Sequence, residues 1–195
     1  MELDNRNDDH ALVEKILNGD MRAFELFVEK YKKLISHIVF RMVHNVEDRE
    51  DICQEVFVKI YRNIGSFQFS SKLSTWVATI AYNNSVNYLQ KRKEPLFDDF
   101  MPEAGQIEIA DENIPSAEEN TEKNDIARLL QSKIGKLTGI YRVIITLYHL
   151  DEMSYNEIVE ITGLPEGTVK SYLFRARKML KDRLMTKYCQ EDLCH

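Results

Sequence analysis

The feature that most constrains this chain lies near its C-terminal end, where residues 154–184 read as two helices joined by a short turn. Ser154 and Glu157 have the spacing of a capping box that begins the first helix, and Gly163 is placed to end it. Pro165 suits the first position of the second helix, where its missing N–H costs nothing. Apolar residues then recur at helical spacing: Ile158, Ile161, Val169, Leu173, Ala176 and Leu180. The pattern predicts a helix-turn-helix.

The second of these helices is basic. Residues 166–187 contain seven Lys or Arg against two acids, a local net charge of +5. Cations, a hydroxyl and an aromatic ring recur on its outward face at offsets of three and four: Lys170, Ser171, Phe174, Arg175 and Lys178. Such a row can neutralise phosphates and read base edges in a DNA groove, so it favours a polyanionic partner. The alternative is a solvated basic helix packed on a neighbour.

The formal net charge of −6 is concentrated in one segment. Residues 95–120 carry eight acids and no Lys or Arg, which leaves 26 basic residues against 24 acids elsewhere. Low hydrophobicity, with Pro102 and Pro115, predicts a flexible acidic linker. The polar N-terminus is unlike a signal peptide, and no apolar run approaches the ~20 residues of a membrane span, so we expect a cytoplasmic protein that does not insert into membranes.

Periodicity predicts four helices before this linker, at His10–Leu17, Met21–Val43, Glu47–Ile64 and about Ser74–Arg92. After it, apolar residues predict two more helices that pack on the helix-turn-helix; the first carries Ile126, Leu129, Leu130 and Ile134, the second Val143, Ile144, Leu147 and Leu150. The expected fold is all-α: two small helical domains over 1–94 and 121–187, the flexible acidic linker over 95–120, and a tail over 188–195.

The third predicted helix has two chemically different faces. Ile52, Val56, Ile60 and Ile64 recur every four residues as a core stripe. The first turns of the other face are crowded with acids: Glu47, Asp48, Glu50, Asp51 and Glu55. Early acids stabilise a helix N-terminus, but this many repel one another. From periodicity alone, a surface for a basic protein partner and a solvated face are equally consistent with the pattern.

The fourth predicted helix contains amides where a helix interior does not favour them. Asn83, Asn84 and Asn87 have poor helix propensity, and their side chains can instead hydrogen-bond base edges. Phe67 and Phe69 lie in the polar turn before this helix, which suits the stacking of single-stranded bases. That Phe67, Phe69 and Trp76 are ordinary core residues is the alternative.

No arrangement typical of an enzyme or a cofactor site stands out. The sequence lacks a phosphate-binding Gly-rich loop, a metal-ligand cluster and a nucleophile with its base, and the five histidines are scattered. We expect no catalytic residue, no metal and no cofactor. We expect Cys53 to be a packing residue. Cys189, Cys194 and His195 leave open a metal or redox role, but two thiolates and one imidazole are one ligand short of a zinc site.

Three motifs in order give nearly the whole chain a resemblance to bacterial RNA polymerase sigma factors of the extracytoplasmic-function (ECF) type, in the sigma-70 family. DREDICQEVFVKIY resembles the region 2 helix that binds the clamp helices of the polymerase β′ subunit. FQFSSKLSTWVATIAYNNSVNYLQKRK resembles the segment that captures and melts the −10 promoter element. LPEGTVKSYLFRARKML resembles the region 4 helix that reads the −35 element.

The resemblance implies a non-enzymatic subunit that directs promoter-specific initiation, with core polymerase (β′ clamp helices and β flap) and promoter DNA as partners. It also implies an anti-sigma partner in the membrane, and a linker that threads the RNA exit path. The implied polymerase-binding residues are Asp48, Asp51, Gln54, Glu55 and Phe57. Those for the −10 element, including a pocket for a flipped base, are Phe67, Lys72, Trp76, Asn83, Asn87, Lys91 and Arg92. Those for the −35 element are Thr168, Lys170, Ser171, Phe174, Arg175 and Lys178.

Two other classes of protein compete with this interpretation. A conventional transcription regulator explains residues 154–184 but gives no reason for the acidic third helix or the asparagines of the fourth. A nucleic-acid-modifying enzyme needs a reactive site that the sequence does not show.

Overall fold

The computed structural model describes the backbone of residues 2–92, 129–130 and 132–192, and the side chains of residues 8–92, 129–130 and 132–185. All regular elements within these ranges are helical, as the all-α prediction requires. The predicted linker at 95–120 and Ile126 lie outside the described residues. So do the side chains of Cys189, Cys194 and His195.

Four helices make up the N-terminal half: α1 (Glu2–Leu17), α2 (Met21–Met42), α3 (Val46–Asn63) and α4 (Leu73–Arg92). A 3-10 turn, η1 (Ile64–Ser66), follows α3. Side chains cap the starts of α2 and α3, because the Asp20 carboxylate accepts from the amides of Arg22 and Ala23, and the Asn45 side chain accepts from the Glu47 amide. Only α1 departs clearly from the prediction, since it begins eight residues earlier than periodicity indicated.

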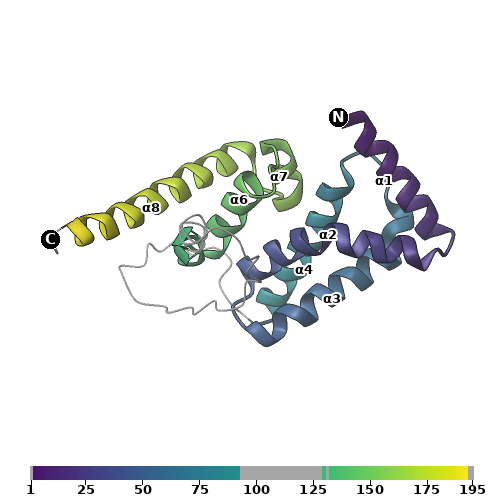
Figure 1. Ribbon diagram of the computed structural model, residues 1–195, viewed down its shortest axis with the longest axis horizontal. Coiled ribbons are helices and arrows are strands. Elements are labelled where there is room, and N and C mark those ends of the chain that lie inside the picture. Colours follow the sequence, from purple (N-terminus) through teal and green to yellow (C-terminus); the bar gives the residue numbers. More distant parts are fainter. Residues whose placement is uncertain (1, 93–128, 131, 193–195) are drawn as a thin grey trace.

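The C-terminal half contains α6 (Gly139–His149), α7 (Tyr155–Thr162) and α8 (Glu166–Asp192), preceded by helical turns at 129–130 and 132–135. Figure 1 shows α8 extending well beyond the other helices. The predicted stripes are buried, with Leu173 and Ile158 at 1% and 0% exposure. Leu130 and Leu150 are corrections, because their side chains are 37% and 42% exposed and neither is part of the core. Leu150 follows the last turn of α6.

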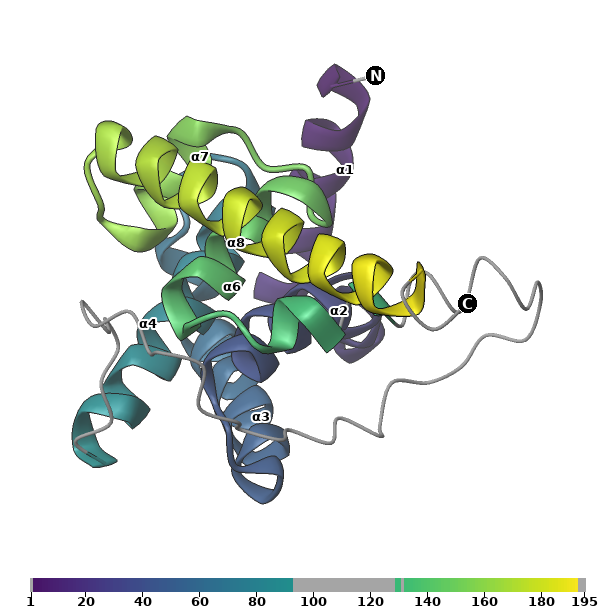
Figure 2. The ribbon, with the colours of Figure 1, turned by 90° about the vertical axis from the view of Figure 1, so that its left-hand side faces the viewer.

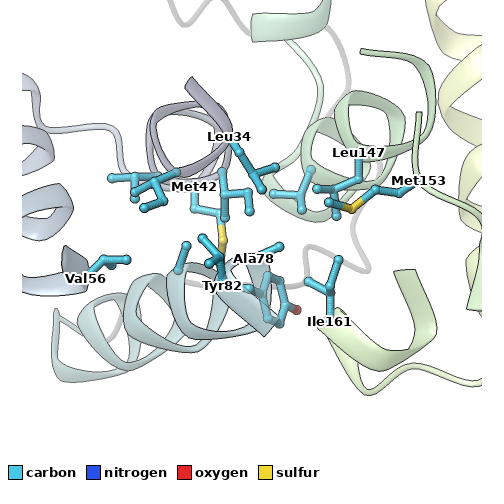
Figure 3. Close-up of a cluster of buried hydrophobic side chains, with 14 of the residues drawn as sticks. Leu34, Met42, Val56, Ala78, Tyr82, Leu147, Met153 and Ile161 are labelled. Atoms are coloured by element: carbon cyan, nitrogen blue, oxygen red, sulfur yellow. The ribbon is translucent and has the colours of Figure 1, made fainter. Parts of the chain in front are cut away.

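The two halves pack against each other. α6 lies against α2, and α7 lies against α4. In the view of Figure 2, α6 and α8 lie in front of the N-terminal helices. Figure 3 shows side chains from both halves in one cluster: Leu34, Met42, Ala78 and Tyr82 with Leu147, Met153 and Ile161. All seven are buried. Burial of apolar surface therefore holds the C-terminal helices on the N-terminal ones.

Candidate nucleic-acid interface

The helix-turn-helix forms as its sequence predicts. The Ser154 amide donates to Glu157 Oε2 at 2.8 Å, and the Glu157 amide donates to Ser154 Oγ at 3.3 Å, which completes the capping box. Gly163 has φ +69°, a left-handed conformation that ends α7 without strain only because the residue lacks a Cβ. The Pro165 carbonyl then accepts from the amides of Thr168 and Val169 and starts α8. These contacts fix the angle at which α8 leaves the turn.

The outward face of α8 is available to a partner. Phe174 is 68% exposed, and Arg175 and Lys178 are exposed as well. Thr168 and Ser171 are half-buried, and the Ser171 hydroxyl donates to the Thr168 carbonyl at 2.9 Å. A basic face with an aromatic ring at its centre is thus present on a fixed helix, as expected of a helix that enters a DNA groove.

Lys170 and Arg177 on α8 have partners within the chain. Lys170 Nζ lies 2.6 Å from Glu166 Oε1, and this hydrogen bond, aided by the charge of Glu166, raises the pKa of Lys170. A phosphate must compete with that carboxylate. Arg177 Nε donates to His149 Nε2 at 3.1 Å, and its guanidinium lies over the Tyr148 ring, so Arg177 holds α8 to α6.

The acidic face predicted on α3 is exposed. Asp51, Gln54 and Glu55 are all exposed on one side of the helix, and Phe57 is half-buried and packs against the core. Asp48 differs from them because it is tied to α4: its Oδ2 accepts from Tyr88 Oη at 2.6 Å and lies 2.8 Å from Arg92 Nη2. The structure therefore joins one predicted polymerase contact to one predicted −10 contact.

The three asparagines of α4 have two different environments. Asn83 and Asn87 are exposed. Asn84 is buried, with its amide oxygen accepting from Lys59 Nζ and its amide nitrogen donating to Glu55 at 3.4 Å. Asn84 is thus a structural link between α3 and α4. Sequence reasoning, which treated the three alike, could have separated them because Asn84 shares a helix face with Leu73, Val77 and Ala81.

A groove of about 460 Å³ lies between α3 and α4 beside this link. Its lining is polar and of mixed charge: Ile52, Glu55, Lys59, Asn84, Asn87, Tyr88, Gln90 and Lys91. Asn87 and Lys91, which we predicted to contact the −10 element, therefore lie at one groove and not on a flat surface. The remaining amide, Asn83, is not part of its lining.

The aromatic residues before α4 form a cluster. The Phe67 ring lies 5.3 Å from that of Trp76 and 4.6 Å from that of Phe69, centroid to centroid. Phe67 is only 8% exposed and Trp76 is half-buried, whereas Phe69 is 38% exposed. Both sequence interpretations therefore apply, because Phe67 is a core residue here while Phe69 remains open to a ligand.

The C-terminal helices contact this same region through Glu157. While Oε2 of its carboxylate completes the capping box, Oε1 lies 3.2 Å from Lys72 Nζ and accepts from Thr75 Oγ1 at 3.3 Å. Burial tends to raise the pKa of Glu157, but hydrogen bonds from Ser154 and Lys72 outweigh it and leave the pKa below its ordinary value. One carboxylate thus caps α7 and holds it on the start of α4.

Two further polar contacts join the halves at the other side of the interface. His37 Nδ1 on α2 lies 3.0 Å from Asp151 Oδ1, and His44 Nε2 lies 3.2 Å from Arg142 Nη2 on α6. Arg142 is 4% exposed and also donates to the Gly135 carbonyl at 3.0 Å. Helical periodicity could not predict that these residues meet, because it does not identify which helices pack together.

We expect the Glu157 contacts to produce a measurable pH dependence. A carboxyl whose pKa is lowered by folding stabilises the fold above its ordinary value of 4.5, and that contribution disappears as the pH falls through the lowered pKa. Glu157→Gln should therefore lower the thermal midpoint at pH 7, and the difference from the wild type should shrink as the pH falls below about 4.5. Glu160→Gln, an exposed residue of the same helix, is the matched control. A constant difference down to pH 3 would contradict the assignment.

The described residues contain neither a metal-ligand cluster nor a membrane-spanning helix. No group of three or more His, Cys, Asp or Glu side chains in them is arranged to hold a metal ion. Within the same part of the chain, every helix is too short or too polar to cross a bilayer.

Each half of the chain matches a known protein family. The family model for sigma-70 region 2 matches residues 27–94, which include α3 and α4, and the model for sigma-70 region 4 matches residues 127–180, which include the helix-turn-helix. In fold, the chain is similar to the sigma factor RpoE in its complex with the anti-sigma factor NepR from Bartonella quintana, with a TM-score of 0.62 and 22% identity over 83% of this chain and 96% of that one. A complex of CnrH with the cytosolic domain of CnrY gives a TM-score of 0.62, at 21% identity over 91% and 97%.

Similarity in sequence is higher among relatives of known function. The chain is 36% identical over 179 residues to the ECF RNA polymerase sigma factor SigW of Bacillus subtilis, covering 88% of this chain and 94% of that protein. It is 36% identical over 180 residues to the ECF RNA polymerase sigma-E factor of Escherichia coli K12, covering 90% and 94%. The chain therefore belongs to the ECF RNA polymerase sigma factors of the sigma-70 family and directs promoter-specific transcription.

Proposed function

We propose that this chain works in the cytoplasm as a non-enzymatic subunit of RNA polymerase, with residues 1–94 contacting polymerase and the −10 element and residues 121–187 contacting the −35 element. Residues 95–120 connect the two domains. The observation that carries the proposal is that three helices expose three chemically different surfaces. α3 exposes an acidic face, α4 exposes amides, and α8 exposes a basic face.

The exposed acids of α3 fit a basic surface of the polymerase. Asp51, Gln54 and Glu55 form the centre of this contact, with Phe57 packed behind them. Asp48 contributes by fixing the end of α4, because it holds Tyr88 and Arg92. Charged residues on such a face steer association and determine its specificity.

The direct test is whether the chain binds sigma-free bacterial core RNA polymerase, measured by size-exclusion chromatography and by titration. We expect co-elution and submicromolar affinity. If the chain fails to bind polymerase and instead binds duplex DNA tightly on its own, with a strong dependence on salt, it is a conventional regulator and the proposal is wrong.

The exposed face of α4 is proposed to open and read the −10 element. Asn83 and Asn87 offer paired donors and acceptors to base edges, and Lys91 continues the same side of the helix toward phosphates. Arg92, at the end of α4, is a further proposed phosphate contact. Extruding a base costs a few kcal/mol, and only a pocket that fits the right base returns that free energy. Recognition and strand opening are thereby coupled.

The neighbours Asn83 and Asn84 give a matched pair of variants. Asn83→Ala removes an exposed amide, so we expect about tenfold weaker −10 opening, measured by permanganate footprinting, with unchanged polymerase binding and thermal midpoint. Asn84→Ala leaves Lys59 and Glu55 without their shared buried partner, so we expect a loss of about 1–3 kcal/mol in the free energy of unfolding. Opposite results for the two positions would show that the faces of α4 are wrongly assigned.

The packed arrangement of the two halves must open on a promoter. A −35 and a −10 site about one and a half turns apart are separated by roughly 54 Å. In this structure α7 lies directly on α4, and Glu157 engages Lys72, a proposed −10 contact. A flexible chain the length of residues 95–120 spans roughly 28 Å on average and about 90 Å when extended, enough to bridge the sites. We propose that the free protein is closed and the promoter-bound protein is open.

An anti-sigma factor, possibly membrane-bound, is a further proposed partner. Its support is that two proteins of similar fold were solved in complexes, one with the anti-sigma factor NepR and one with the cytosolic domain of CnrY. A protein that binds both halves at once would stabilise the closed arrangement, because it would favour the state it contacts more fully. If this protein transcribes at the full rate in cells with and without every neighbouring gene for a membrane protein, a membrane-bound partner is excluded.

A further inference from the structure

The exposed side of α3 changes its charge along the length of the helix. Six exposed side chains at helical spacing line one groove of about 500 Å³, and we call them the α3 stripe: Asp51, Gln54, Glu55, Val58, Lys59 and Arg62. The first three are two acids and an amide, the fourth is apolar and 48% exposed, and the last two are cations. In the view of Figure 1, α3 lies along the lower edge of the molecule. The proposed polymerase contact uses only the first half of this stripe.

The α3 stripe is complementary in charge to a second copy of itself. When the second copy lies antiparallel across it, a two-fold axis near Val58 brings Asp51 of each copy opposite Arg62 of the other. The same axis brings Glu55 opposite Lys59, because the midpoints of the two pairs agree to about half a residue along the helix. The exposed Val58 side chains then lie near each other at the centre of the contact. Acids, an apolar centre and cations in this order therefore favour a symmetric contact.

The outer pair of this contact, Asp51 with Arg62, is the one that most needs a second copy. Glu55 and Lys59 are both bound to the amide of Asn84 within the chain. In the part of the chain that the structure describes, the side chains of Asp51 and Arg62 make no hydrogen bond or ion pair. An opposite charge on a second copy therefore meets no competing group at these two positions, so they should decide whether two copies associate.

We infer that the α3 stripe is a docking surface for a second copy of this chain, and that two α3 helices pack antiparallel in a symmetric dimer. Six residues from each copy are few against the roughly 20–30 of a standard interface, so we expect a weak dimer with a Kd of roughly 10–100 µM. The dimer covers Asp51, Gln54 and Glu55, so a second copy and polymerase compete for the same surface. This competition rests on the proposed polymerase contact, whereas the dimer itself does not.

The experiment measures the mass of the full chain by sedimentation equilibrium at concentrations from about 2 to about 300 µM, which bracket the expected Kd. It compares the wild type, Asp51→Arg, Arg62→Glu and an equimolar mixture of these two variants. In the dimer of either variant alone, like charges oppose each other at both outer pairs. In a mixed dimer of the two variants, opposite charges meet again at both outer pairs. Lys33→Glu, at an exposed position of α2, is the control with the same change of charge as Arg62→Glu.

We expect the wild type and Lys33→Glu to associate with a similar Kd, and each α3 variant alone to associate at least about tenfold more weakly. The mixture should recover a Kd within about threefold of the wild type, which a variant that merely failed to fold could not do. The inference is wrong if the wild type stays monomeric throughout the range, if Arg62→Glu associates as well as Lys33→Glu, or if mixing restores nothing.

A second measurement tests the competition with polymerase. Sigma-free core polymerase added to the wild-type dimer should convert it to a complex that holds one copy of the chain. If polymerase instead binds the intact dimer, or does not bind the chain at all, the proposed polymerase contact is wrong, while the sedimentation result on the dimer stands by itself.

Discussion

Joining residues 37 and 151 by a short covalent bridge is expected to abolish promoter-dependent transcription. His37 and Asp151 contact each other at 3.0 Å across the two halves. A chain with His37→Cys and Asp151→Cys, and with its three native cysteines changed to Ser, can be joined there by a cleavable thiol-reactive linker. α7 then stays on α4, and the −35 and −10 surfaces cannot reach sites roughly 54 Å apart. Cleaving the linker with a reductant should restore run-off transcription.

A matched bridge within the N-terminal half separates this effect from chemical damage. Asp9 and Lys30 are in contact at 2.7 Å between α1 and α2. An Asp9→Cys and Lys30→Cys chain, joined in the same way, should transcribe normally with the linker intact. Equal transcription from the joined and cleaved forms of the 37–151 chain would show that the closed arrangement is compatible with promoter binding.

The double variant Asp51→Ala with Glu55→Ala is expected to weaken polymerase binding about a hundredfold. Close charge pairs at protein interfaces contribute upward of about 1.5 kcal/mol each, and both carboxylates are exposed on the same side of α3. Titration of labelled chain with core polymerase at two salt concentrations measures the loss. The salt dependence of binding should fall as well, because two charges leave the interface.

Two acids on α2 provide the control for this variant. Glu25 and Glu29 are exposed, and Glu25→Ala with Glu29→Ala removes the same charge from a different surface. We expect its polymerase affinity to stay within about twofold of the wild type, since long-range charge effects are screened at physiological salt. If the α2 pair caused the larger loss, or if the α3 variant lost DNA opening but not polymerase binding, the acidic face of α3 would have another role.

Sequence periodicity predicted the helices and their buried stripes because each depends on neighbours one turn away. The stripe of α3 through Val56 and Ile60 is fully buried, as is that of α8 through Val169 and Ala176. The capping box at Ser154 was predictable for the same reason, since both its members lie within one turn.

The closed arrangement could not be predicted in this way, because it depends on which apolar faces meet. One signal was present. In α6, the consecutive residues Val143, Ile144 and Ile145 are all buried, and so is Leu147; an apolar face this wide must be covered by more than its own domain. The burial of Asn84 could have been predicted from its place on the same helix face as Val77 and Ala81. Its partners Lys59 and Glu55 could not, because they lie on another helix.

The proposed opening of the protein exposes the apolar cluster shared by α2, α4, α6 and α7, so it should depend on temperature. Exposing that cluster to water raises the heat capacity, and hydrophobic association weakens on cooling. The fraction of open protein should therefore increase on cooling, at temperatures where both domains are still folded. On this proposal, the balance between the closed and the open protein depends on temperature through the packing of its own two halves.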